Sequence, residues 1–124
     1  MENIVLIGFK GSGKTAVGKP LAKKLHMQFI DVDDVIEKMH TKEKKEKLSV
    51  RSMFKKYGEE YFRLMESRAL ESLQKETMKV IATGGGSVVA PPNRSLIQSL
   101  GTVVFLDAAK EKLFLRIQQR GFPP

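Results

Sequence analysis

The sequence predicts an α/β fold in which helices cover both faces of a parallel sheet, a three-layer αβα arrangement. Short, wholly apolar runs such as Ile4–Ile7 are typical of strands that are buried on both faces. Segments with the helical spacing of apolar residues lie between these runs, and such alternation is typical of βαβ units. The 124 residues amount to about one domain, so we expect a single domain over residues 1–124.

Each predicted element follows from local patterning. Apolar runs predict strands at Ile4–Ile7, Phe29–Ile30, Val80–Ala82 and Val103–Leu106. Apolar residues at helical spacing predict helices at Thr15–Leu25, from Val35 onward, and at Ser49–Leu73, Asn93–Leu100 and Ala109–Arg120. Pro20 removes a backbone hydrogen bond inside the first helix, so we expect a kink or a break there. Gly58 is expected to divide the long helical stretch in two.

Composition excludes several classes of protein and site. The chain has no cysteine, which excludes disulfide frameworks, thiolate metal clusters and cysteine nucleophiles. His26 and His40 are its two histidines, too few for a histidine-rich metal site. No apolar run approaches the roughly 18 residues of a membrane span, which excludes an integral membrane protein. Met1–Asn3 leads into the first strand without a basic leader, so we expect a cytoplasmic protein.

The net charge of +8 indicates an anionic partner such as a nucleotide, a phosphometabolite or a nucleic acid. Residues 38–56 contain eight basic and two acidic residues, so this segment accounts for +6 of the total. Its most biased part, Lys42–Lys47, is expected to be a solvated loop or helix face, because no aromatic residues interleave it as base stacking requires. We therefore expect no nucleic-acid partner.

A glycine-rich motif between the first strand and the first helix predicts a phosphate-binding site. Residues Gly8–Thr15 match the pattern G-x-x-x-x-G-K-S/T in full, which is the P-loop or Walker A motif. The glycines let backbone N–H groups converge on phosphate oxygens, and the helix N-terminus adds partial positive charge. Lys14 can reach the outer phosphates, and the Thr15 hydroxyl can bind Mg²⁺. The predicted ATP-binding residues are Gly11, Ser12, Gly13, Lys14, Thr15 and Ala16.

Magnesium bound to ATP also requires a protein carboxylate near Thr15, which P-loop proteins place at the end of a neighbouring strand. Asp31 and Asp107 each follow an apolar strand. We favour Asp31, because Asp33 lies two residues further on and such a pair can divide the work. One carboxylate would hold the metal and the other would face an acceptor hydroxyl. Asp107 is then expected to cap a helix.

Four motifs, in this order along nearly the whole chain, make the sequence resemble the shikimate kinase family. They are the P-loop, Asp31-Val32-Asp33, the segment Gly58–Glu66 and the segment Ile81–Gly86. The resemblance implies a sheet in the order 2-3-1-4-5 and transfer of the ATP γ-phosphoryl group to the 3-hydroxyl of shikimate, on the route to chorismate and the aromatic amino acids. In this chain it implies the order 2-3-1-4, with the fifth strand, the C-terminal helix and most of the lid missing.

The resemblance also implies roles for individual residues. Lys14 and Asp33 would be catalytic, and Asp33 would bind the shikimate hydroxyls. Arg63 would clamp the substrate carboxylate, and Glu66 at i+3 could hold Arg63 in place. Arg116 would stack on adenine. The glycines whose backbone would approach the substrate are Gly84, Gly85 and Gly86.

Departures from the family pattern leave alternatives open. Extra residues at Lys42–Lys47 lengthen the substrate-binding region, and the family's lid arginine falls on Pro123, so that arginine is absent or moved to Arg120. Thr102–Leu106 would become an unprotected sheet edge if the chain ended at Pro124, so we expect a longer natural protein. The alternatives are a related kinase of an acid such as gluconate, and a nucleotide-binding module without turnover. A monomer is expected rather than an oligomer.

Overall fold

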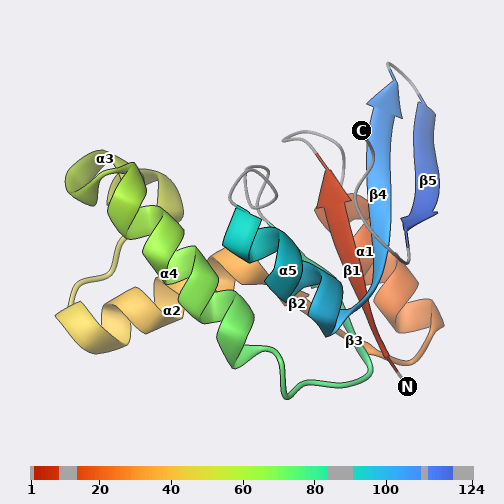
Figure 1. Cartoon of the computed structure of the whole chain (residues 1–124), viewed down its shortest axis with the longest axis horizontal. Helices are drawn as coiled ribbons and strands as arrows, with labels where there is room; N and C mark the ends of the chain where they lie inside the picture. The colour runs from red at the N-terminus through yellow and green to blue at the C-terminus, as the bar shows by residue number, and fades with distance from the viewer. Residues whose placement is uncertain (1, 9–13, 84–90, 110–111, 119–124) are drawn as a thin grey trace.

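The computed structural model describes residues 2–8, 14–83, 91–109 and 112–118 (Figure 1). Its strands are β1 (Asn3–Gly8), β2 (Gln28–Asp31), β3 (Lys79–Ala82), β4 (Gly101–Ala109) and β5 (Lys112–Gln118). They form one sheet in the order β2-β3-β1-β4-β5. The first four strands are parallel and keep the order 2-3-1-4, which confirms the predicted α/β fold class.

Helices cover both faces of the sheet, as predicted. They are α1 (Lys14–Lys24), α2 (Val32–Lys44), α3 (Val50–Tyr57), α4 (Glu59–Ser72) and α5 (Pro91–Leu100). Alternate residues of β1 face opposite sides: Val5 and Ile7 join the larger core with α2 to α5, while Leu6 packs with Ala22 of α1. Figure 1 shows α1 and α5 on opposite sides of β1. None of the described helices is long and apolar enough to cross a membrane.

Local caps explain where the helices between β2 and β3 begin and end. The Asp31 carboxylate accepts a hydrogen bond from a backbone N–H in the first turn of α2, and Ser49 does the same for α3. Lys45 ends α2 in the left-handed conformation. Gly58 separates α3 from α4 with a φ of 92°, a backbone conformation that favours glycine, and this confirms the predicted division.

The first helix does not break at its proline. α1 runs without interruption from Lys14 to Lys24 with Pro20 inside it, so the prediction of a break is wrong. The opposite face of α1 packs closely on the sheet: a Cβ added at Gly18 would lie 2.4 Å from the Phe29 ring. The free energy gained by packing this helix against β2 therefore outweighs the cost of the hydrogen bond that the proline removes.

The last predicted element is wrong in type. Residues Ala109–Arg120 are predicted as a helix, but β4 extends to Ala109 and Lys112–Gln118 forms β5, antiparallel to β4. Leu113, Leu115 and Ile117 recur with the period of a strand, while Leu113 and Ile117 also fit a helix, so periodicity alone cannot separate the two. Without β5, the backbone N–H and C=O groups along one side of β4 would lack a partner strand. A strand at Lys112–Gln118 can pair with these groups and a helix cannot, which favours the strand.

The β4–β5 pair corrects one further expectation. Its register runs from Val103 opposite Gln118 to Ala109 opposite Lys112, so β4 is not the edge of the sheet. β5 lies beside β4 in the sheet, but it is antiparallel and is therefore not the fifth parallel strand that the resemblance implies. The exposed-edge argument for a longer chain is therefore wrong.

Candidate functional site

The carboxyl ends of three neighbouring strands lie level with one another. Ala82 of β3 is in register with Leu6 of β1 and with Asp31 of β2. Beyond β3, the backbone N–H and the hydroxyl of Thr83 both donate to the carbonyl oxygen of Leu6, at 3.0 and 3.1 Å. Ligands of parallel α/β sheets bind at this edge. The sheet therefore gathers there the end of β1, Asp31 and the residues that precede the glycine triplet.

The predicted phosphate-binding residues continue from this edge into α1. Gly11–Gly13 lie outside the described residues. Lys14 and Thr15 are the first two residues of α1, and Ala16 follows them at an exposed position. Their backbone therefore forms the N-terminal end of a helix, where N–H groups and the helix dipole favour an anion. The roles of the Lys14 and Thr15 side chains stay predictions.

Asp31 lies where β2 ends and α2 begins. Its Oδ1 accepts a hydrogen bond of 2.9 Å from the backbone N–H of Asp33, which is the N-cap interaction of α2. This bond stabilises the first turn of the helix and orients the Asp31 carboxylate at the carboxyl edge of the sheet. The predicted metal ligand thus has a structural role of its own.

Asp33 occupies the first turn of α2 and is half-buried. Burial raises the pKa of its carboxyl group from 3.8 to about 6, and negative charges nearby add to this effect. The charges are those of Asp31, Glu66, Glu37 and Asp34. A carboxylate with a pKa near 6 is largely ionised at neutral pH and is a better proton acceptor than an ordinary aspartate.

The expected pair of Arg63 and Glu66 is present in α4. Arg63 Nη1 donates to Glu66 Oε1 at 2.9 Å, and the Glu66 side chain is buried whereas that of Arg63 is 28% exposed. The guanidinium also lies 5.4 Å from the centroid of the Phe62 ring. The charge of Glu66 raises the pKa of Asp33, so the buried end of this pair lies within electrostatic reach of the half-buried aspartate of α2.

The remaining predicted residues fall in other places. Gly84–Gly86 lie outside the described residues. Arg116 lies in β5 in register with Phe105, and not in a helix; its adenine role stays a prediction. Asp107 lies inside β4, opposite Phe114, so the expectation that it caps a helix is wrong. The cause is the same in both cases, because the chain after β4 pairs as a hairpin.

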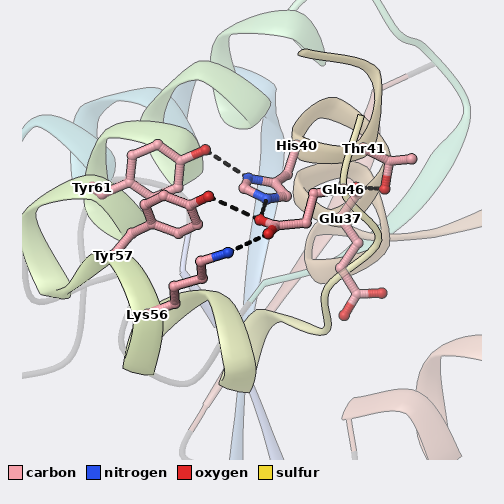
Figure 2. A network of polar contacts seen from close by, with 7 residues as sticks. All are labelled: Glu37, His40, Thr41, Glu46, Lys56, Tyr57 and Tyr61. Carbon is pink, nitrogen blue, oxygen red and sulfur yellow. Dashed lines mark hydrogen bonds and ion pairs between the residues drawn. The ribbon is translucent and has the colours of Figure 1, made fainter. Parts of the chain in front are cut away.

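Sequence reasoning missed a polar network that joins α2, α3 and α4 (Figure 2). His40 is fully buried; its Nε2 donates to Glu46 Oε1 at 2.9 Å and its Nδ1 lies 2.7 Å from the Tyr61 hydroxyl. Glu46 also accepts from the Tyr57 hydroxyl at 2.8 Å and pairs with Lys56. These hydrogen bonds lower the pKa of Glu46 to about 2.

The network changes how the charged segment Lys42–Lys47 is understood. Most of the segment is exposed, as expected, but Glu46 is held by side chains of two helices, α2 and α3. The sequence contains one signal of this arrangement: His40 follows Val32 and Ile36 at helical spacing on the buried face of α2. A histidine on an apolar face needs partners for both ring nitrogens, and Glu46 supplies one of them.

Comparison with known proteins identifies the family. The model of the shikimate kinase family matches residues 10–123. The chain belongs to the shikimate kinase family. It is 47% identical over 120 residues to shikimate kinase of Enterococcus faecalis and 43% identical over 119 residues to that of Alkaliphilus oremlandii. Each match covers 96% of this chain and 67% of the relative. The family predicted from the motifs is thereby confirmed, and its members are ATP-dependent phosphotransferases.

Solved structures agree with this assignment. Shikimate kinase from Acinetobacter baumannii in complex with shikimate matches with a TM-score of 0.76 and 37% identity. The enzyme from Aquifex aeolicus matches with a TM-score of 0.75 and 38% identity. The matches cover 85% and 88% of this chain, but 55% and 61% of those structures. The chain therefore spans about two thirds of its curated relatives and a smaller share of the solved chains.

Proposed function

We propose that this chain carries the phosphate-binding and acceptor-binding part of a shikimate kinase, which transfers the γ-phosphoryl group of ATP to the 3-hydroxyl of shikimate. The observation that carries the proposal is the pairing of Arg63 with Glu66, the residue whose charge acts on the half-buried Asp33. A guanidinium can bind the carboxylate of the acceptor, and an aspartate can bind its hydroxyls. The shikimate bound to the Acinetobacter baumannii enzyme supports the choice of acceptor.

The residues present suit phosphoryl transfer, which depends mostly on positioning and on neutralising charge. Asp33, with its pKa raised to about 6, would orient the attacking hydroxyl and accept its proton. Arg63 would hold the far end of the acceptor through its carboxylate. Lys14, at the start of α1, would neutralise charge on the outer phosphates.

Magnesium fits the donors at the carboxyl edge of the sheet. Thr15 and Asp31 would supply oxygen ligands, the type that Mg²⁺ prefers, and the Asp31 carboxylate is already oriented by its bond to α2. Among the residues that the structure describes, no three side chains of metal-binding type gather at one point. That arrangement suits Mg²⁺, which commonly takes one or two protein ligands and completes its shell with phosphates and water. When bound, the ion would neutralise phosphate charge.

The test is acceptor-dependent release of ADP. The chain is incubated with MgATP and either shikimate or gluconate, ADP is measured by a coupled assay, and the phosphorylated product is identified by ³¹P NMR. ADP and 3-phosphoshikimate formed with shikimate alone would support the proposal. Turnover with gluconate alone would indicate the related kinase, and ATP binding with no acceptor-dependent ADP would indicate a nucleotide-binding module.

The setting of the reaction is also part of the proposal. We expect the protein to act as a monomer, with ATP and shikimate as its partners, and size-exclusion chromatography with light scattering measures this directly. Because ATP is the phosphoryl donor, we expect the cytoplasm as its location, which imaging of a tagged protein can check.

A further inference from the structure

Glu66 is a buried carboxylate with two donors on one oxygen. Its side chain is 1% exposed, and its Oε1 accepts from Arg63 Nη1 and from Asn93 Nδ2, each at 2.9 Å. A buried carboxylate is costly unless hydrogen bonds and a positive charge compensate for the lost water. Arg63 supplies the charge and Asn93 supplies a neutral donor from a different helix.

The orientation of the Asn93 amide is set by a second contact. Asn93 is fully buried, and its Oδ1 accepts a hydrogen bond from the Ser67 hydroxyl in α4. If the amide were flipped, its oxygen would face the Glu66 carboxylate and repel it, so the nitrogen must point toward Glu66. Both ends of the amide are therefore used, and both contact α4.

The contact between Asn93 and Glu66 joins two helices. Asn93 is the third residue of α5, the helix that packs on α4, whereas Arg63 and Glu66 both lie in α4. Arg63 reaches solvent with 28% of its side chain, so its guanidinium can bind a ligand while one nitrogen stays on Glu66. The direction of the guanidinium thus depends on where Glu66 is held, and Asn93 holds it.

We propose that Asn93 is a positioning residue that fixes Glu66, and through Glu66 turns the Arg63 guanidinium toward the carboxylate of the acceptor. The inference rests on the proposed function, because it assigns acceptor binding to Arg63. Without the Asn93 donor, Glu66 loses the hydrogen bond that ties it to α5, so its position and that of the Arg63 guanidinium become less fixed. A guanidinium in several orientations binds a carboxylate less tightly, because its order must be established on binding.

The main test compares the chain with its Asn93→Leu variant, which keeps a side chain of similar size but has no group that can donate to Glu66. Shikimate and MgATP affinities are measured by calorimetry, and rotation of the Arg63 guanidinium is measured by ¹⁵N NMR without ligand. We expect faster rotation and about tenfold weaker shikimate binding, the loss expected for one hydrogen bond to a charged group. MgATP affinity is expected to stay within about twofold.

Two controls separate positioning from loss of stability. Asn3 is also buried, at the amino end of β1, and donates to the carbonyls of Glu76 and Leu100 at 2.8 and 3.0 Å. Asn3→Leu should lower the melting temperature and leave shikimate affinity unchanged. In an Arg63→Ala background, Asn93→Leu should cause no further loss of shikimate affinity, because it acts through Arg63.

The outcomes decide between this inference and the proposed function. Unchanged Arg63 rotation and shikimate affinity in a folded Asn93→Leu variant would overturn the inference, as would a loss that persists without Arg63. If the variant does not fold, Asn93→Ala removes the same donor with a smaller side chain and is judged by the same measurements. If the unmodified chain does not bind shikimate, the proposed function fails, and the Arg63 NMR signals then decide the positioning role by themselves.

Discussion

Replacing Asp33 by asparagine should stabilise the fold while it removes the proposed proton acceptor. The pKa of Asp33 is raised from 3.8 to about 6, so the folded chain binds its proton more tightly than the unfolded chain does. Stability from this group is present below pH 3.8 and is lost as the pH rises through about 6. Asparagine resembles the protonated carboxyl and has no such loss.

The size of this effect follows from the shift. The shift is about two pKa units, and each unit corresponds to about 1.4 kcal/mol, which sets an upper figure of about 3 kcal/mol. Because Asp33 is half-buried, solvent screening reduces the expected gain to about 1–2 kcal/mol at pH 7.5. Near pH 3.5 the gain should disappear, because the parent Asp33 is then protonated in both states.

Urea unfolding followed by circular dichroism, without nucleotide or magnesium, measures the free energy of unfolding at both pH values. Asp34→Asn is the matched control: Asp34 lies in the same helical turn but is exposed. Its removal loses the favourable charge at the helix N-terminus and relieves only the smallest of the named repulsions on Asp33. An Asp33→Asn variant no more stable than the parent at pH 7.5, or equally stabilised at pH 3.5, would refute the reasoning.

Three further predictions concern other parts of the chain. Lys14→Ala should slow ADP release by about a hundredfold or more, and full turnover would remove Lys14 from the mechanism. Hydrogen bonds hold the pKa of Glu46 at about 2, so the stability that Glu46 adds is present above pH 4.5 and is lost as the pH falls toward 2. The free energy of unfolding of a Glu46→Gln variant should therefore depend less on pH in this range, and a pH dependence equal to that of the parent would contradict this. Gly101→Ala should cost more than about 2 kcal/mol in urea unfolding, because the new Cβ would lie 2.1 Å from the Asn3 carbonyl oxygen; unchanged stability would disprove that packing.

The parts of the fold that could be predicted are those in which local pattern and tertiary environment agree. Ile4–Ile7 is apolar on both faces and lies in the interior of the sheet, so its sequence permits one structure. Gly58 divides α3 from α4 because its φ of 92° is costly for other residues. The spacing of Arg63 and Glu66 at i, i+3 likewise predicts their contact, since such residues are neighbours on any helix.

Prediction failed where the same sequence pattern is compatible with two kinds of local structure. Residues 112–118 fit a helix and a strand, and the unpaired edge of β4 favours the strand. Pro20 is costly in an isolated helix, but α1 packs closely enough on β2 to continue through it. Both failures come from contacts with another strand, which a local window of sequence does not contain.

The sequence by itself predicts the features that depend on neighbours along the chain. These are the phosphate-binding motif, the order of strands and helices up to β4, and the carboxylate pair Asp31 and Asp33. Which helix supplies the second donor to Glu66, and which glutamate reaches His40, was decided by the tertiary structure alone. Buried polar groups form hydrogen bonds with the groups that packing places next to them. The spacing of residues along one helix does not predict a partner that lies on another helix.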